Sequence, residues 1–185
     1  MFQGAVVETV HWKKFMGLLD WLTGNKAAPA GVPRQSVADL RAGILAANRD
    51  TAPFVIRDGA PEGVDLVAEW KIVDAVWYEI FAKAGLEKVF KVLMKFDEAK
   101  GEVRAVDQEW EVEWRAGLPS LSLAASAFRG QKTEMSFGTA YAFREDASYG
   151  KVYEYRFNTK ELKTPLIDAA QAAGWGWKGV AFGKL

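Results

Sequence analysis

The side chains that perform most enzyme chemistry are scarce in this chain. It has one histidine, His11, and no cysteine among 185 residues. His11 lies in an N-terminal segment that we expect to be separable from the domain, so a Ser-His-Asp arrangement has no base. Zinc sites built on thiolate or histidine ligands are excluded for the same reason. Any catalysis would have to rest on carboxylates and tyrosines.

Carboxylates alternate with other residues from Asp107 to Trp114. Because side chains alternate along a strand, the four acids would share one face: Asp107, Glu109, Glu111 and Glu113. Paired carboxylates can act as acid and base. We expect a solvated surface instead. A hairpin that joins the apolar rows on one face places these acids beside Lys91 and Lys95, where cross-strand ion pairs form.

Two further patterns resemble ligand sites only in part. The segment from Gly174 to Gly179 fits G-x-G-x-x-G, but we expect a helix before it and a strand after it, the reverse of a dinucleotide site. Its glycines are therefore expected to make room for tryptophan packing. The acids Asp58, Glu62 and Asp65 miss the EF-hand spacing. We expect neither a cofactor nor a metal ion.

Aromatic residues are abundant, with eight tryptophans, eleven phenylalanines and five tyrosines. A subset falls on apolar faces of expected strands and forms the candidate ligand lining: Trp70, Trp110, Trp114, Phe137, Tyr141, Tyr153 and Tyr155. These rings could simply form a packed core, since aromatic residues dominate core energetics. They could also line a cup that holds a small apolar ligand, with tyrosine hydroxyls as polar contacts.

Charge and hydropathy bound the location and the partners. The chain has 24 basic and 24 acidic residues, and this balance argues against nucleic-acid binding. It contains no apolar run of about 18 residues and no pattern of a secretory signal. We therefore expect a cytoplasmic protein.

The sequence divides into a leader and one domain. Residues 1–35 comprise an amphipathic helix from His11 to Thr23 and a linker rich in Pro, Ala and Gly. Met16 could be a second start site, which would make residues 1–15 a dispensable extension. The leader carries too few lysines for strong attraction to anionic lipid, so we do not expect it to bind membranes. Residues 36–185 are expected to form a single α+β domain.

The expected elements of this domain follow hydrophobic periodicity and capping residues. Ser36 begins the first helix as an N-cap, and Thr164 with Pro165 begins the last helix. The expected elements are helices over 36–48, 74–84 and 166–173, and strands over 53–57, 66–73, 90–96, 106–114, 118–128, 134–143, 151–157 and 175–182. The fold is predicted as α+β. A mostly antiparallel, strongly bent sheet or barrel-like meander carries a short inserted helix, a C-terminal helix and a last strand.

Three function classes follow from these features. The first is non-enzymatic binding of a small apolar ligand in the aromatic cup. The second is a protein–protein interaction module that uses an exposed aromatic or acidic sheet face, with the leader helix as tether. The third, ranked last because of the poor catalytic inventory, is an enzyme that uses carboxylates and tyrosines. The oligomeric state is left open.

Overall fold

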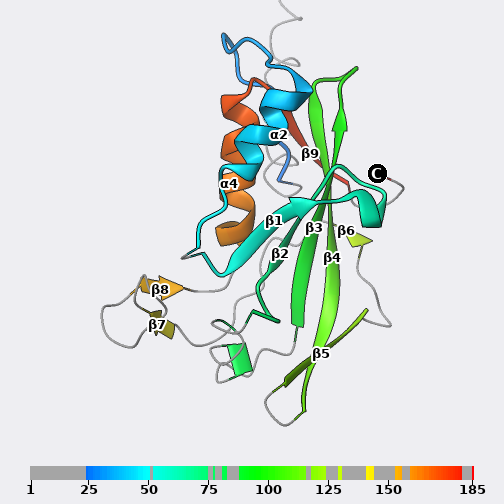
Figure 1. Cartoon of the computed structure of the whole chain (residues 1–185). Coiled ribbons are helices and arrows are strands. Elements are labelled where there is room, and N and C mark those ends of the chain that lie inside the picture. Colours follow the sequence, from blue (N-terminus) through cyan, green and yellow to red (C-terminus); the bar gives the residue numbers. More distant parts are fainter. Residues whose placement is uncertain are drawn as a thin grey trace, which may run out of the picture.

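Two helices lie against one face of a mixed sheet (Figure 1). The computed structural model describes residues 24–50, 52–74, 77, 81–82, 88–115, 118–123, 129–130, 141–143, 153–155, 159–180 and 185. The helices are α2 (Val37–Leu45) and α4 (Thr159–Ala172). We call the sheet face that they cover the helix-side face and the opposite one the outer face. The α+β class predicted from the sequence is confirmed.

The sheet is an antiparallel meander with additions at one side. Its sequential strands are β1 (Phe54–Asp58), β2 (Leu66–Trp70), β3 (Lys88–Asp97), β4 (Glu102–Arg115) and β5 (Leu118–Leu123). The 3-10 turn η1 (Ala60–Glu62) connects β1 to β2. A separate pair consists of β7 (Tyr141–Phe143) and β8 (Tyr153–Tyr155). The path of strands from β1 to β5 is open among the described residues.

Strand β4 is the centre of the sheet. One of its edges pairs with β3 along 102–111. Its other edge is shared by three strands in turn: β9 (Gly176–Gly179) runs parallel to it, and β6 (Arg129–Gly130) and β5 run antiparallel. The last strand predicted after the C-terminal helix is therefore present, and it pairs beside a strand that is distant in the sequence.

The register of the β3–β4 hairpin corrects the predicted one. Asp97 pairs with Glu102, so the loop has four residues, 98–101, which reverses the expected parity. Val92 consequently lies opposite Asp107, and Phe90 lies opposite Glu109. The sequence pattern misled because β4 is buried on both faces. Val103 and Ala105 are buried on the helix-side face, whereas Val106 and Val112 are buried on the outer face.

The helices show one confirmed and one corrected boundary. Ser36 caps α2 as predicted, because its Oγ accepts a hydrogen bond from the Asp39 N–H at 3.2 Å. The predicted start of the last helix at Thr164 is wrong. Helix α4 already includes Thr159, and Pro165 lies inside it. Proline lacks an N–H, so one hydrogen bond of the helix is missing there. No helix in the described part of the chain has the length and apolar character needed to cross a membrane.

The hydrophobic core lies between the helices and the sheet. It joins Leu40 and Ile44 of α2 to Leu162, Leu166 and Ala170 of α4. The sheet contributes residues of the helix-side face: Phe54, Ile56, Leu66, Ala68, Trp70, Phe90, Val92, Met94, Val103 and Ala105. Trp175 and Trp177 are also fully buried. Burial of these large apolar side chains supplies the main driving force for folding.

Residues 25–35, which we call the strap, are hydrogen-bonded to the end of the chain. Lys26 forms an antiparallel bridge with Trp177, and Gln35 N–H donates to the Ala173 carbonyl at 2.9 Å. Arg34 lies over the Trp175 ring at 5.7 Å and donates to the Glu98 carbonyl. The separability of residues 1–35 stays a prediction, and these contacts lead us to expect that removal of the strap lowers stability.

The glycines of the Gly174–Gly179 segment make room for the strap. Gly174 has φ +74°, and a Cβ there would lie 2.6 Å from the Pro33 carbonyl oxygen. A Cβ on Gly176 would lie 3.2 Å from the Lys26 carbonyl oxygen. The glycines therefore permit close approach of another backbone. They were predicted to make room for tryptophan side chains.

The free edge of β1 is capped by a side chain. The Asn48 amide donates to the Ile56 carbonyl at 2.8 Å and accepts from the Ile56 N–H at 2.7 Å. Both backbone groups are thereby satisfied on the side away from β2, which removes them from pairing with another chain.

Candidate functional site

Two buried carboxylates with lysine partners lie on the helix-side face and form the candidate functional site. We call it the acid–lysine cluster: Asp107, Glu109, Lys88 and Lys163. Asp107 is 1% exposed and Glu109 is 4% exposed. Lys163 Nζ lies 2.5 Å from Asp107 Oδ2, and Lys88 Nζ lies 3.0 Å from Glu109 Oε1. Three elements therefore converge here, namely α4, β3 and β4.

The fold places these residues where the apolar core ends. Along the helix-side face of β4, Val103 and Ala105 are fully buried, and the next residues are Asp107 and Glu109. Lys163 follows Leu162 in α4, so the packing of Leu162 against the sheet brings the ammonium to β4. Further along the same face, Glu113 has a 63% exposed side chain. The carboxylates thus run from buried to exposed along one strand.

Burial makes these charges costly. Removing a carboxylate or an ammonium from water costs several kcal/mol even after relaxation, and an ion pair offsets this cost only with good geometry. A core of apolar residues at these positions would avoid the cost. Residues that violate the rules of core composition occur mainly at functional sites, although ion pairs with a purely structural role also exist.

The arrangement offers defined chemistry. Residues two apart on a strand lie about 7 Å apart on one face, which is within the range of carboxylate pairs that perform acid–base catalysis. Carboxylate oxygens also accept hydrogen bonds from hydroxyl or ammonium groups of a ligand. The lysines balance the acids, so the cluster as a whole has no net charge.

An aromatic cluster adjoins these charges. Phe90 lies opposite Glu109 in the register, and the Trp70 ring contacts Phe90 edge to face with centroids 6.0 Å apart. Trp70 makes similar contacts with Phe54 at 6.5 Å and with Phe81 at 6.4 Å, and Trp77 stacks at a tilt on Phe81. All five rings are buried. The described members of this cluster are therefore packed against one another.

The structure does not bring the predicted lining residues together on one face. Trp70 lies on the helix-side face, whereas Trp110 and Trp114 lie on the outer face of β4, because β4 has the opposite parity to the predicted one. Trp110 packs under the Lys91 ammonium at 4.8 Å.

The remaining predicted lining residues come from the segment after β6. Tyr141 lies opposite Tyr155 in the β7–β8 pair, and Phe143 lies opposite Tyr153. Phe137 lies outside the described residues. The proposed lining role of these aromatic residues stays a prediction.

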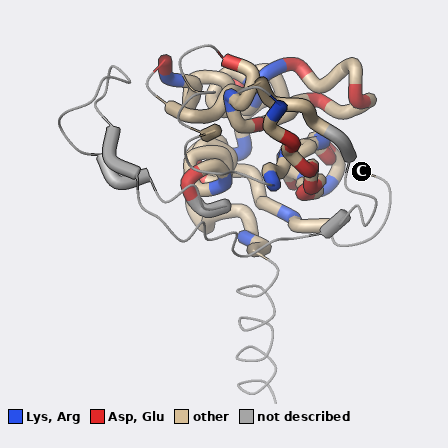
Figure 2. The backbone as a smooth tube through the Cα atoms, turned by 90° about the horizontal axis from the view of Figure 1, so that it is seen from below, with Lys and Arg blue, Asp and Glu red and all other residues tan. Residues whose placement is uncertain are grey.

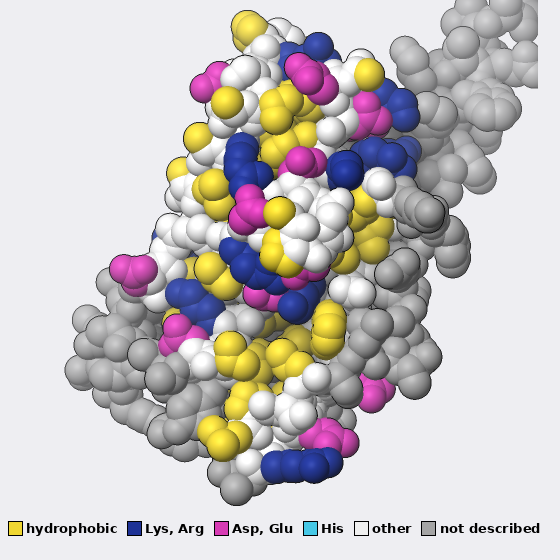
Figure 3. Space-filling model, turned by 45° about the vertical axis from the view of Figure 1, so that its right-hand side comes forward, with side chains coloured by type: hydrophobic (Ala, Val, Ile, Leu, Met, Phe, Trp, Pro, Cys, Tyr) yellow, Lys and Arg dark blue, Asp and Glu magenta, His cyan; other side chains and the backbone are white. Residues whose placement is uncertain are grey.

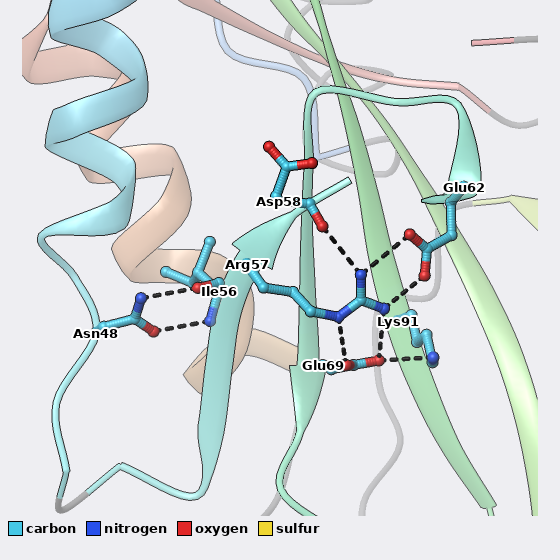
Figure 4. Close-up of polar contacts among 7 residues, drawn as sticks. All are labelled: Asn48, Ile56, Arg57, Asp58, Glu62, Glu69 and Lys91. Carbon is cyan, nitrogen blue, oxygen red and sulfur yellow. Dashed lines mark hydrogen bonds and ion pairs between the residues drawn. The ribbon is translucent and has the colours of Figure 1, made fainter. Parts of the chain in front are cut away.

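The outer face carries a second group of charges, which we call the outer network: Arg57, Glu62, Glu69 and Lys91 (Figure 4). Arg57 Nε lies 2.7 Å from Glu69 Oε1, and Lys91 Nζ lies 2.6 Å from Glu69 Oε2. Arg57 also bonds Glu62 in η1 at 2.5 Å. The network joins three neighbouring strands and the turn between β1 and β2.

The outer network shifts the pKa of Arg57, Glu62 and Glu69. Hydrogen bonds to Glu62 and then to Glu69 hold the pKa of Arg57 above its ordinary value. The hydrogen bond from Arg57 lowers the pKa of Glu62. Burial alone would raise the pKa of Glu69, but hydrogen bonds from Arg57 and Lys91 outweigh it, so that pKa is lowered. All of these groups are therefore charged at neutral pH.

The acids that miss the EF-hand spacing have protein partners. Arg41 forms an ion pair with Asp58, and the Phe96 N–H donates to Asp65 Oδ2 at 2.7 Å. Glu62 belongs to the outer network. Among the described residues, no three acids or histidines are arranged to hold a metal ion.

Sequence reasoning found the acids but not their environment. Asp107 and Glu109 were assigned to a solvated face beside Lys91 and Lys95, and this assignment is wrong, since both are buried on the helix-side face. Lys163 was missed, because a single lysine in a helix carries no local signal of a partner 56 residues away.

Basic and acidic residues are both spread over the described chain (Figure 2). Comparison with known proteins adds no further constraint. No protein-family model, no curated protein and no solved structure matches the chain, so its function has to be argued from its own residues.

Proposed function

We propose that the chain binds a small ligand at the end of the helix-side core, where the aromatic cluster meets Asp107 and Glu109. The observation that supports it is the near-complete burial of these two carboxylates beside Phe90, whose ring contacts Trp70. Ligand sites are mainly apolar and contain a few polar groups that fix the ligand's orientation. The junction of aromatic rings with two carboxylates has this composition.

The proposal includes the finer part of the predicted fold. The end of the sheet at Trp70 would bend into a cup. Trp70 would form its wall together with β7 and β8, which contain Tyr141, Tyr153 and Tyr155. The ligand would have an apolar body against the rings. Its polar end would be a hydrogen-bond donor, either a hydroxyl or an ammonium group, because carboxylates accept hydrogen bonds.

The test uses three probes that share one alkyl chain and differ in the polar end: dodecylamine, dodecanol and dodecanoate, each below its critical micelle concentration. Tryptophan fluorescence and the melting temperature are followed during titration. We expect saturable quenching by the amine or the alcohol. At about 100 times the Kd the added stability should be about 2.7 kcal/mol. Dodecanoate should bind more weakly, since its carboxylate meets two others.

A matched pair of variants assigns the effect to the cluster. Glu109→Gln removes a buried charge, and Glu113→Gln removes an exposed charge from the same face of the same strand. Glu109→Gln should weaken binding of the amine at least tenfold, and Glu113→Gln should leave it unchanged. Equal affinities in both variants, or no saturable binding of any probe to the wild type, would contradict the proposal.

A second candidate function is supported by exposed apolar side chains on β5, at the edge of the sheet. Leu118 is 66% exposed and lies opposite Arg115, and Leu121 is 36% exposed and lies opposite Val112, so the two leucines project from opposite faces of this edge strand. Figure 3 shows hydrophobic side chains in the lower half of the molecule, below a band of charged residues. An exposed apolar patch is typical of a protein-binding surface. The variant Leu118→Ser/Leu121→Ser should then bind less bis-ANS at unchanged melting temperature, and equal dye binding would argue against the patch.

A further inference from the structure

The edge of β9 that faces away from β4 is filled by the strap. The Trp177 N–H donates to the Lys26 carbonyl at 2.7 Å, and the Lys26 N–H donates to the Trp177 carbonyl at 2.8 Å. The Gly179 N–H donates to the Asn25 side-chain oxygen at 2.7 Å. Trp177 and Gly179, two residues apart on this edge of β9, are thus bonded by two consecutive residues, through the backbone of Lys26 and the side chain of Asn25. A segment that adds to the edge of a sheet makes bonds of this kind.

Recognition of the strap by this edge depends on its backbone. The side chains of Lys26, Ala27 and Ala28 are exposed, whereas the Asn25 amide takes part in bonding. Gln171 adds a hydrogen bond to the Ala27 carbonyl at 3.0 Å. Gly176 lets this backbone approach, because a Cβ there would lie 3.3 Å from the Ala28 N–H nitrogen. Any chain with the same short sequence in an extended conformation offers the same contacts.

A short exposed connector separates this part of the strap from its second anchor. Gln35 and Arg34 are held by α4 and the β3–β4 loop. Between them and Ala28 lie Pro29 to Pro33, where Gly31 has φ +78° and no atom would lie within 4 Å of a Cβ. Such a connector can in principle direct the segment onto its own β9 or onto that of a neighbour, which is the condition for domain swapping.

We propose that the outward edge of β9 is a strand-addition site, and that the segment 24–28 of a second copy of the chain can fill it in exchange. The contacts in the exchanged dimer are those of the monomer, so only the effective concentration decides between them. For a short connector that concentration is in the millimolar range. The monomer therefore dominates in dilute solution, and exchange increases as the protein is concentrated.

The first experiment refills the edge with a peptide. In the full-length variant Asn25→Ala/Lys26→Pro the chain's own segment loses two of its bonds to β9, because proline lacks the N–H that donates to the Trp177 carbonyl and alanine lacks the side-chain oxygen that accepts from Gly179. A synthetic peptide of residues 24–32 should bind this variant saturably. At about ten times its Kd it should raise the melting temperature by about 3–5 °C. The peptide with the same two replacements is the control and should have no effect.

Absence of saturable peptide binding to the folded variant would overturn the proposal. If the double variant does not fold, the single variant Asn25→Ala takes its place, because it loses only the bond to Gly179. The peptide should then bind Asn25→Ala more tightly than it binds wild type, and equal affinities would overturn the proposal.

The second experiment tests the second copy directly. Sedimentation velocity of the wild-type chain from about 10 μM to about 1 mM should show a growing dimer fraction, in the concentration range that the connector sets. The variant Asn25→Ala/Lys26→Pro should show at least a tenfold smaller dimer fraction at each concentration. A wild-type chain that stays monomeric throughout would overturn exchange between copies, even if the peptide binds.

Discussion

The outer network and the acid–lysine cluster lie on opposite faces of the sheet and differ in the burial of their carboxylates. In the outer network the side chains of Arg57, Glu62, Glu69 and Lys91 are between 18% and 32% exposed. In the acid–lysine cluster the side chains of Asp107 and Glu109 are at most 5% exposed. The outer charges stay near water and tie β1, β2 and β3 together at small cost. The inner carboxylates and Lys163 lose most of their hydration, whereas Lys88 stays 45% exposed, so loss of a partner at the Asp107–Lys163 pair should cost more than at the outer network.

The largest effect is expected from Asp107→Ala. It leaves the Lys163 ammonium, with a side chain only 12% exposed, without its carboxylate. Breaking a buried ion pair by removing one partner costs about 3–5 kcal/mol, measured as the loss in free energy of unfolding by urea denaturation. The double variant Asp107→Leu/Lys163→Met should regain most of that loss, because it removes both charges. A loss below about 1 kcal/mol in the single variant would show that the Asp107–Lys163 pair contributes no more to stability than an ordinary surface ion pair.

A smaller loss is expected from Glu69→Ala in the outer network. It removes the carboxylate that Arg57 and Lys91 share, and both partly exposed cations can then be hydrated by solvent. We expect a cost of about 1–2 kcal/mol, between that of an exposed ion pair and that of a buried hydrogen bond to a charge. A loss as large as that of Asp107→Ala would mean that burial does not distinguish the two faces.

The outer network also predicts acid sensitivity. The pKa values of Glu62 and Glu69 are lowered in the folded protein, so their contribution is fully present above their unfolded pKa of about 4.3. It is lost as the pH falls through the lowered folded values. Urea midpoints between pH 7 and pH 2 should fall less steeply below about pH 4 in Glu62→Gln/Glu69→Gln than in wild type. Parallel curves would show that other carboxylates carry the acid response.

The smallest effect is expected from Glu113→Gln. This residue lies on the same face and strand as Asp107 and Glu109, but its side chain is 63% exposed and pairs with the 81% exposed Arg115. The free energy of unfolding should change by less than about 0.5 kcal/mol. The contrast with Asp107→Ala isolates burial, because strand, face and charge are the same. A loss above about 1 kcal/mol would show that the strand itself cannot tolerate the change.

The sequence predicted the elements better than their pairing. Local signals such as the Ser36 cap and the strand periods recovered α2 and the meander from β1 to β4. The parity of β4 was wrong because its apolar residues cover the helix-side face at one end and the outer face at the other. The burial of Asp107 followed from that error. The glycines at 174 and 176 were the one sequence signal for the strap, because they indicate close approach of another segment. The sequence could not identify that segment, since it lies far away in the chain.

The strap has a consequence for the order in which the protein can form during synthesis. Lys26 pairs with Trp177, so 151 further residues must be translated after Lys26 before its partner exists. At about 5–20 residues per second the segment waits about 8–30 s for its partner strand. Throughout that interval its backbone N–H and carbonyl groups are hydrated and open to other chains. The sheet can be completed along β4 only after β9 has left the ribosome, so pairing of the strap depends on a strand that is synthesised much later.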